Sequence, residues 1–178
     1  MSTKYKKYLS NAGLSTNEWG PSGWYFLFSC IMGSYPMKIN NNNKEHIKIK
    51  KEFKNMFNSL SYTMPCIFCK ISYKQFCKEL PIEEGLIGRI ELMHWLYQIK
   101  DKVNKKLMLQ ELECYNDNKS NIDTKYKNNN ITKIEYNNLI NNLKKNTFIT
   151  SKSPTFINVL NQYESIRAKC STKSKTCR

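Results

Sequence analysis

Two cysteines three positions apart offer the clearest chemistry in this sequence. Cys66 and Cys69 stand in "MPCIFCK", directly behind Pro65. Proline suits the first position of a helix, so we expect a helix over about 66–78 with both thiols at its start. Unpaired amides and the helix dipole favour negative charge on a sulfur there, and the spacing permits a small, reducible disulfide ring. The local sequence suits a redox couple, while half of a zinc site and a pair of buried thiols stay open as alternatives.

The zinc alternative needs two further ligands. The chain has no second Cys-x-x-Cys, its two histidines stand alone, and Cys170 and Cys177 are spaced more widely than a usual zinc pair. A second dithiol near the end of the chain instead suits a relay, because thiol–disulfide exchange can pass electrons from a partner protein to Cys66 and Cys69. We therefore expect no metal and a shuttle disulfide Cys170–Cys177, the other interpretation being a stray pair in a polar tail.

Composition limits the class of protein. The chain has 178 residues, 40% of them hydrophobic, and a formal charge of +15. Its lysines are scattered along the chain, and an A- and T-rich genome would give the same Lys, Asn, Ile and Tyr content, so nucleic acid is not the expected partner. The start lacks a secretory signal, and the longest apolar run, "WYFLFSCIM", is about half of a membrane span. We expect a soluble, intracellular protein, where seven cysteines favour catalysis or metal binding over structural disulfides.

Helical spacing of apolar residues recurs along the chain. Ser22 is a plausible N-cap for a helix that stops at Pro36, and Ser153 caps another in which Pro154 takes the first helical position. The segment 115–130 is polar and aperiodic and is predicted to be a flexible link. The other predicted helices cover about 44–62, 66–78, 86–107 and 131–145. The helix over 66–78 is expected to bury Phe68, Tyr73 and Phe76. The helix over 86–107 carries the stripe Leu92, Leu96, Ile99, Val103 and Leu107.

These elements predict an all-α protein, a four-helix bundle with a short fifth helix and a C-terminal tail helix. We expect a polar N-terminal lead-in at 1–18 and the bundle core at 19–112. A polar link and the fifth helix follow at 113–145, and a C-terminal segment with the tail cysteines at 146–178.

Three blocks in register resemble a known family. "WGPSGWYFL", "MPCIFCK" and "WLYQIKDKVNKKL" are similar to the W-G-P-x-x-W-x-x-L-H, P-C-x-x-C and W-L-x-x-x-H-N-x-V-N-x-K-L motifs of the Erv/ALR family of FAD-linked sulfhydryl oxidases. The likeness is greatest to forms encoded by large DNA viruses and covers about residues 19–112. It implies an FAD-binding helical bundle core and a homodimer joined across its first two helices.

The resemblance also implies a mechanism. Substrate proteins with dithiols would reduce Cys170–Cys177, and this pair would attack Cys66 of a catalytic Cys66–Cys69 disulfide. Cys69 would pass electrons to FAD, and molecular oxygen would leave as hydrogen peroxide. No membrane partner is expected, and the implied locations are the cytoplasm of an infected host cell and the virion.

The family's cofactor contacts map onto nine positions, some of them changed in this chain. Phe28 replaces the first-block histidine, and Lys100 and Asp101 replace the His-Asn pair. Cys114 matches a cysteine whose nearby disulfide partner is absent here. The rival interpretation is a basic helical module without enzymatic activity that binds zinc and nucleic acid. The implied FAD-binding residues are Gly20, Trp24, Phe28, Lys100, Asp101, Val103, Asn104, Lys106 and Leu107.

Overall fold

The computed structural model describes residues 13–168, so the predicted shuttle cysteines, Cys170 and Cys177, lie outside the described part. These residues form helices joined by short connections, and the only β-type pairing among them is two isolated bridges. No helix in this range combines the length and the apolar character that a membrane crossing requires. The described chain is therefore all-α, as predicted. The described residues divide into two compact units, one of residues 13–100 with 154–168 and one of residues 101–153.

The first helix, α1 (Thr16–Ser34), begins earlier than the sequence predicted. Ser15 is its N-cap residue and Pro21 lies inside it, where we expected Ser22 to start the helix. A proline in a helix loses one backbone hydrogen bond, and α1 continues through Pro21 all the same. The end agrees with the prediction, because α1 stops just before Pro36.

Helices α2 (Lys44–Thr63) and α3 (Ile67–Glu79) pack against each other. The Tyr73 hydroxyl of α3 donates a hydrogen bond to the Phe57 carbonyl of α2 at 3.0 Å, and both residues are buried. The expectation that Phe68 lies on the same buried side is wrong, since its side chain is 71% exposed. Phe68 and Tyr73 are five residues apart, which is one full helical turn plus roughly 140°. Their side chains therefore lie on different faces of α3.

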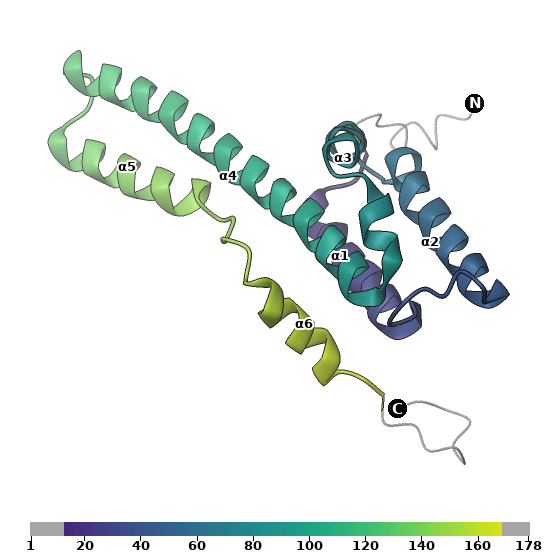
Figure 1. Ribbon diagram of the computed structural model, residues 1–178. Helices are drawn as coiled ribbons and strands as arrows, with labels where there is room; N and C mark the ends of the chain where they lie inside the picture. The colour runs from purple at the N-terminus through teal and green to yellow at the C-terminus, as the bar shows by residue number, and fades with distance from the viewer. Residues whose placement is uncertain (1–12, 169–178) are drawn as a thin grey trace, which may run out of the picture. The chain divides into compact units, whose positions relative to one another are not determined.

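The core of the first unit lies between these helices and the start of α4 (Arg89–Lys127) (Figure 1). Leu92, Leu96 and Ile99 are fully buried, which confirms the beginning of the predicted stripe. A short 3-10 helix, η2 (Ile82–Ile87), precedes α4. Polar groups are paired around this core: the Trp95 indole donates to the Leu80 carbonyl at 2.9 Å, and the Tyr35 hydroxyl to the Leu86 carbonyl at 2.9 Å.

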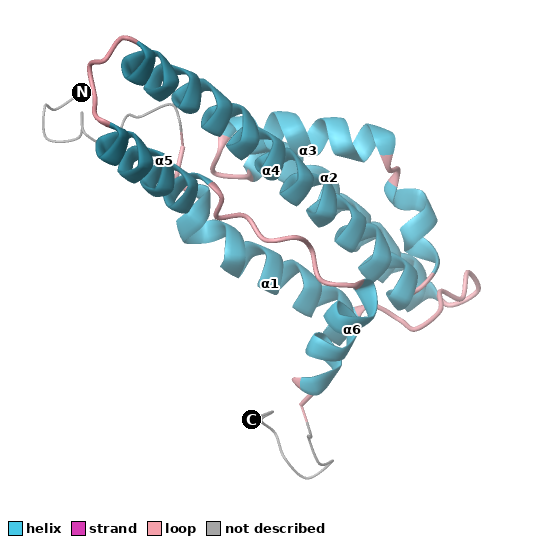
Figure 2. Cartoon of the chain, turned by 90° about the vertical axis from the view of Figure 1, so that its left-hand side faces the viewer, coloured by secondary structure: helices cyan, strands magenta, loops and turns pink. Residues whose placement is uncertain are grey.

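The second unit contains the remainder of α4 and α5 (Lys133–Thr147), which lie alongside each other in Figures 1 and 2. The prediction of a flexible link at 115–130 is wrong, because α4 continues as far as Lys127. Side chains one turn apart support this polar stretch, as in the ion pair of Lys119 with Asp123 at 2.6 Å. Helix α5 contacts this part of α4, where the Tyr136 hydroxyl donates a hydrogen bond to the Asp123 carboxylate at 2.8 Å.

The last described helix, α6 (Phe156–Ser165), starts later than predicted. Thr155 is its N-cap, where we expected Ser153 to be the cap and Pro154 the first helical residue. Both of these have other partners: the Ser153 hydroxyl accepts a hydrogen bond from Asn104 at 3.0 Å, and the Pro154 carbonyl accepts one from Tyr97 at 2.9 Å. Helix α6 packs against α1 in the first unit.

Candidate active site

A disulfide between Cys66 and Cys69 forms the chemical centre of the first unit. Cys66 is the N-cap of α3 and Cys69 lies in its first turn, with 5.2 Å between their Cα atoms. The Cys69 backbone N–H donates to the Cys66 sulfur at 3.2 Å. The sulfur therefore takes the place of an oxygen cap, and the same N–H and the helix dipole favour negative charge on it once the disulfide is reduced.

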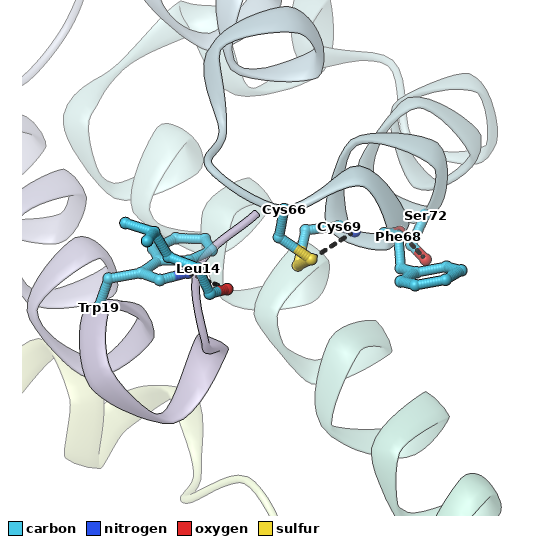
Figure 3. Close-up of a disulfide and its surroundings, with 6 residues drawn as sticks. All are labelled: Leu14, Trp19, Cys66, Phe68, Cys69 and Ser72. Atoms are coloured by element: carbon cyan, nitrogen blue, oxygen red, sulfur yellow. Dashed lines mark hydrogen bonds between the residues drawn. A yellow bond between two sulfur atoms is a disulfide. The ribbon is translucent and has the colours of Figure 1, made fainter. Parts of the chain in front are cut away.

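The two sulfurs differ in access. Cys66 is buried, with 8% of its surface exposed, whereas Cys69 is only half-buried. Figure 3 shows Leu14 and Trp19 on one side of the disulfide and the ring of Phe68 pointing away on the other. Gly13 pairs with Cys66 in one of the isolated bridges. Cys69 is therefore the more exposed residue of the pair.

Sequence reasoning missed the residues that cover Cys66. Leu14 donates its backbone N–H to the Pro65 carbonyl at 2.6 Å, and its own carbonyl accepts the Trp19 indole N–H at 3.4 Å. Gly13 has φ of +86°, a conformation that favours glycine. A single glycine in a polar lead-in was the only sequence signal, and its contact with Cys66 spans more than fifty residues of sequence.

Four predicted cofactor-binding residues belong to the first unit. Trp24 is half-buried beside the core, and Gly20 has open space where a side chain would project. Phe28 is 2% exposed and its ring stacks on Tyr163 of α6, with 5.2 Å between ring centroids. Lys100 is half-buried on α4, and burial lowers the pKa of its ammonium group.

The other five lie within two turns of α4 in the second unit. Asp101 is engaged by Lys105 at 2.7 Å, and this hydrogen bond is the main cause that holds the pKa of the Asp101 carboxyl below its ordinary value. The Asn104 amide donates to Ser153. Val103 and Lys106 are half-buried and Leu107 is exposed, so this helix face combines apolar, amide and cationic groups.

The remaining described cysteines form no disulfide within residues 13–168. Burial raises the pKa of the Cys30 thiol and that of the Cys77 thiol, and for Cys77 a hydrogen bond with Tyr73 partly offsets the rise. Cys114 is exposed on α4. No group of three or more potential metal-ligating side chains occurs in this part of the chain.

A separate pocket of about 360 Å³ lies at the other end of α3 from the disulfide. Glu79, Glu84, Glu91 and His94 give it polar walls, and Phe156 of α6 lines another side. It contains neither a cysteine nor a residue from the predicted cofactor set, so the disulfide remains the candidate active site.

Known proteins are similar to this chain over the region that contains the disulfide. The profile described as the Erv1/Alr family matches residues 21–127. A probable FAD-linked sulfhydryl oxidase of Acanthamoeba polyphaga mimivirus is 33% identical over 92 residues, which are 51% of this chain and 59% of that protein. The mitochondrial FAD-linked sulfhydryl oxidase of Saccharomyces cerevisiae is 32% identical over 96 residues, 53% of this chain and 46% of the relative. The chain thus spans about half the length of the curated relatives it matches.

A solved structure, the crystal structure of the yeast Erv1 core, is also similar. The likeness has a TM-score of 0.44 and 27% sequence identity, and it covers 57% of this chain and 79% of that one.

Proposed function

The chain belongs to the Erv1/Alr family, and we propose that it is an FAD-dependent sulfhydryl oxidase that forms disulfides in substrate proteins. The observation that carries this proposal is the Cys66–Cys69 disulfide at the start of α3. It lies inside the stretch that the family profile matches, and both curated relatives carry the name FAD-linked sulfhydryl oxidase.

The sulfur chemistry follows from thiol–disulfide exchange. A substrate thiolate attacks the Cys66 sulfur, forms a mixed disulfide with it and releases Cys69 as a thiolate. The second substrate thiolate attacks the substrate sulfur of that mixed disulfide, so the substrate leaves oxidised and Cys66 becomes a thiolate. Two electrons have then moved to the cysteine pair, and the two substrate protons go to solvent. The Cys69 N–H and the α3 dipole stabilise the charge left on Cys66.

FAD, when bound, would accept this electron pair from Cys69 and deliver it to molecular oxygen, which leaves as hydrogen peroxide. The groups present in the chain fit such a cofactor. Lys100 has no ion-pair partner within residues 13–168, and an anionic group beside it would offset the burial that lowers its pKa. The Ser29 hydroxyl, one residue after Phe28, is buried without a hydrogen-bond partner in the described structure. It could form a hydrogen bond with a polar atom of the ligand.

The residues assigned to FAD follow from the family motifs. We assign Trp24, Lys100, Val103, Asn104, Lys106 and Leu107 to it, with Gly20 offering open space on α1. Two further residues, Phe28 and Asp101, could contact FAD only after a neighbouring side chain moves. Phe28 reaches a ligand only if Tyr163 moves off its ring, and Asp101 only if Lys105 releases its carboxylate.

Partners and location extend the same proposal. Substrate proteins with dithiols and molecular oxygen are the reactants, and Cys170 and Cys177 relay electrons from the protein substrates to Cys66. We assign a homodimer joined across α1 and α2, and an activity in the cytoplasm of an infected host cell and in the virion. Two points support this location. One relative comes from a mimivirus, and a virus that assembles in the reducing cytosol needs its own source of disulfides.

Oxygen consumption by cysteine variants tests the function. Cys66→Ser and Cys69→Ser should each abolish turnover of a small dithiol, while Cys114→Ser, exposed and far along the sequence from the pair, should leave it unchanged. Changing Cys170 and Cys177 together should spare the small dithiol and slow a reduced protein substrate. Full oxygen consumption by either catalytic variant rules out the assignment, and equal rates on the protein substrate rule out the relay.

A spectrum of the purified protein separates this proposal from the zinc and nucleic-acid module. An oxidase is yellow, with a flavin absorption band that bleaches under dithiol without oxygen. A colourless protein that releases zinc to a chelator supports the other function.

A further inference from the structure

A short N-terminal segment lies directly on the attacked half of the disulfide. Gly13 forms a bridge with Cys66, and the Leu14 N–H donates to the Pro65 carbonyl at 2.6 Å. We call residues Gly13 and Leu14 the strap. Figure 3 shows its Leu14 end and Trp19 together on one flank of the disulfide. The strap therefore lies against the backbone of Pro65 and Cys66, at the start of the catalytic pair.

Only glycine fits the point of closest contact. A Cβ on Gly13 would collide with the Pro65 carbonyl oxygen and lie 3.0 Å from the Cys66 Cα. The φ of +86° is a second reason, since other side chains disfavour that conformation. The sequence therefore places a residue without a side chain at the position that covers Cys66.

The strap is held by few interactions. The Leu14 side chain is 65% exposed, so it contributes little apolar burial. Within residues 13–168, its attachments are the bridge to Cys66, the hydrogen bond to Pro65 and the long indole bond from Trp19 at 3.4 Å. A segment that buries so little surface opens at lower cost than packed helices do.

Cys66 is largely buried while the strap lies on it. The proposed exchange requires a thiolate to reach the Cys66 sulfur, yet this residue is 8% exposed. We propose that the strap is a displaceable cover, and that a cysteine-bearing segment of a dithiol substrate that reacts with Cys66 directly, in addition to the Cys170–Cys177 relay, reaches it by taking the strap's place on the Pro65 carbonyl. This inference rests on the proposed function, because it concerns the substrate class and access at the same pair.

The strap itself shows what the substrate must offer. Its backbone presents the Leu14 N–H to the Pro65 carbonyl, as an added strand does at a sheet edge. A substrate segment that repeats this contact brings its thiolate beside Cys66. The thiolate then bonds to the Cys66 sulfur, the Cys66–Cys69 bond breaks, and Cys69 leaves with the electron pair. Cysteines in extended, locally unfolded segments are thus the preferred substrates, and cysteines on rigid helices react slowly.

Gly13→Val in the full chain removes the cover, and Gly33→Ala is its matched control. Gly33 lies on α1 with open space where a Cβ would project. The proteins are reduced and reacted with N-ethylmaleimide, and mass spectrometry follows modification of Cys66 and of Cys69 separately. We expect the ratio of Cys66 to Cys69 modification rates to rise about tenfold or more in Gly13→Val and to stay at the wild-type value in Gly33→Ala.

A second variant covers the case in which Gly13→Val fails to fold. Trp19→Phe keeps an aromatic ring and removes the indole N–H that donates to Leu14, so the ratio should rise by a smaller factor. A wild-type ratio in the folded variants overturns the inference. The measurement needs neither flavin nor oxygen, so it is independent of the oxidase assay. Oxidase activity retained in Cys66→Ser would instead remove the proposed function.

Discussion

Tyr163→Ala should release α6 from the bundle while leaving the bundle folded. Helix α6 has 10 residues, too few to be stable alone in water. Its docking depends on Tyr163, which is 6% exposed and stacks on Phe28 at 5.2 Å and lies 5.8 Å from Tyr25. Phe156 adds an edge contact with His94 at 4.8 Å, so the helix has two aromatic attachments.

The size of the effect follows from the burial of this ring. Truncation of a buried aromatic side chain to alanine costs about 3–5 kcal/mol. Helix α6 lies at the chain end of its unit, and it can open without the other helices. We therefore take the low end of the range as the loss of docking free energy. A loss of about 3 kcal/mol corresponds to roughly a 100-fold larger population of the undocked helix.

Hydrogen exchange with peptide resolution measures this population. Amides of residues 156–165 should exchange roughly 100-fold faster in Tyr163→Ala, while those of residues 89–100 keep the wild-type rate. Tyr163→Phe is the control, because it keeps the ring and the Tyr163 hydroxyl makes no hydrogen bond within residues 13–168. Unchanged exchange in Tyr163→Ala, or an equal increase in Tyr163→Phe, would refute the reasoning that ring stacking holds α6.

Two further perturbations test other parts of the structure. Burial raises the pKa of the Cys30 and Cys77 thiols above the value near 9 that an unfolded chain has, so above pH 9 the unfolded chain loses protons that the folded one keeps. The free energy of unfolding in urea under reducing conditions should then fall from pH 9 upward, and less steeply in the Cys30→Ala, Cys77→Ala double variant; equal slopes would contradict this. Asp123→Ala removes the acceptor for Tyr136 and should speed hydrogen exchange in α5, whereas Asp117→Ala, exposed on the same helix, should not; the reverse order would count against the polar contact between α4 and α5.

The parts that the sequence predicted depend on local signals. Pro65 followed by two cysteines placed the start of α3, and the structure has Cys66 as its N-cap. The spacing of Leu92, Leu96 and Ile99 identified the buried face of α4, because an amphipathic stripe needs no knowledge of its partner helix. Each of these signals is complete within about ten residues of sequence.

The extension of α4 shows where local reading fails. Residues 115–127 are polar and show no apolar period, which indicates a link when they are read alone. In the folded chain, contacts within the helix and with α5 stabilise the same residues, such as the ring contact of Tyr126 with Tyr136 at 4.8 Å. Tyr136 belongs to α5, which starts only at Lys133. A polar stretch therefore becomes helical through residues that a local window does not contain.

Segments outside the region that the family profile matches contact residues of the candidate site. The profile matches residues 21–127, whereas Gly13 on Cys66 and Tyr163 on Phe28 lie beyond its two ends. Motifs carried over from the family assign a reactive sulfur to Cys66 and a ligand-facing ring to Phe28. In this chain flanking residues contact both, and 8% of Cys66 and 2% of Phe28 are exposed. The motifs that suggest the chemistry therefore lie inside the matched region, whereas contacts to Cys66 and Phe28 also come from outside it.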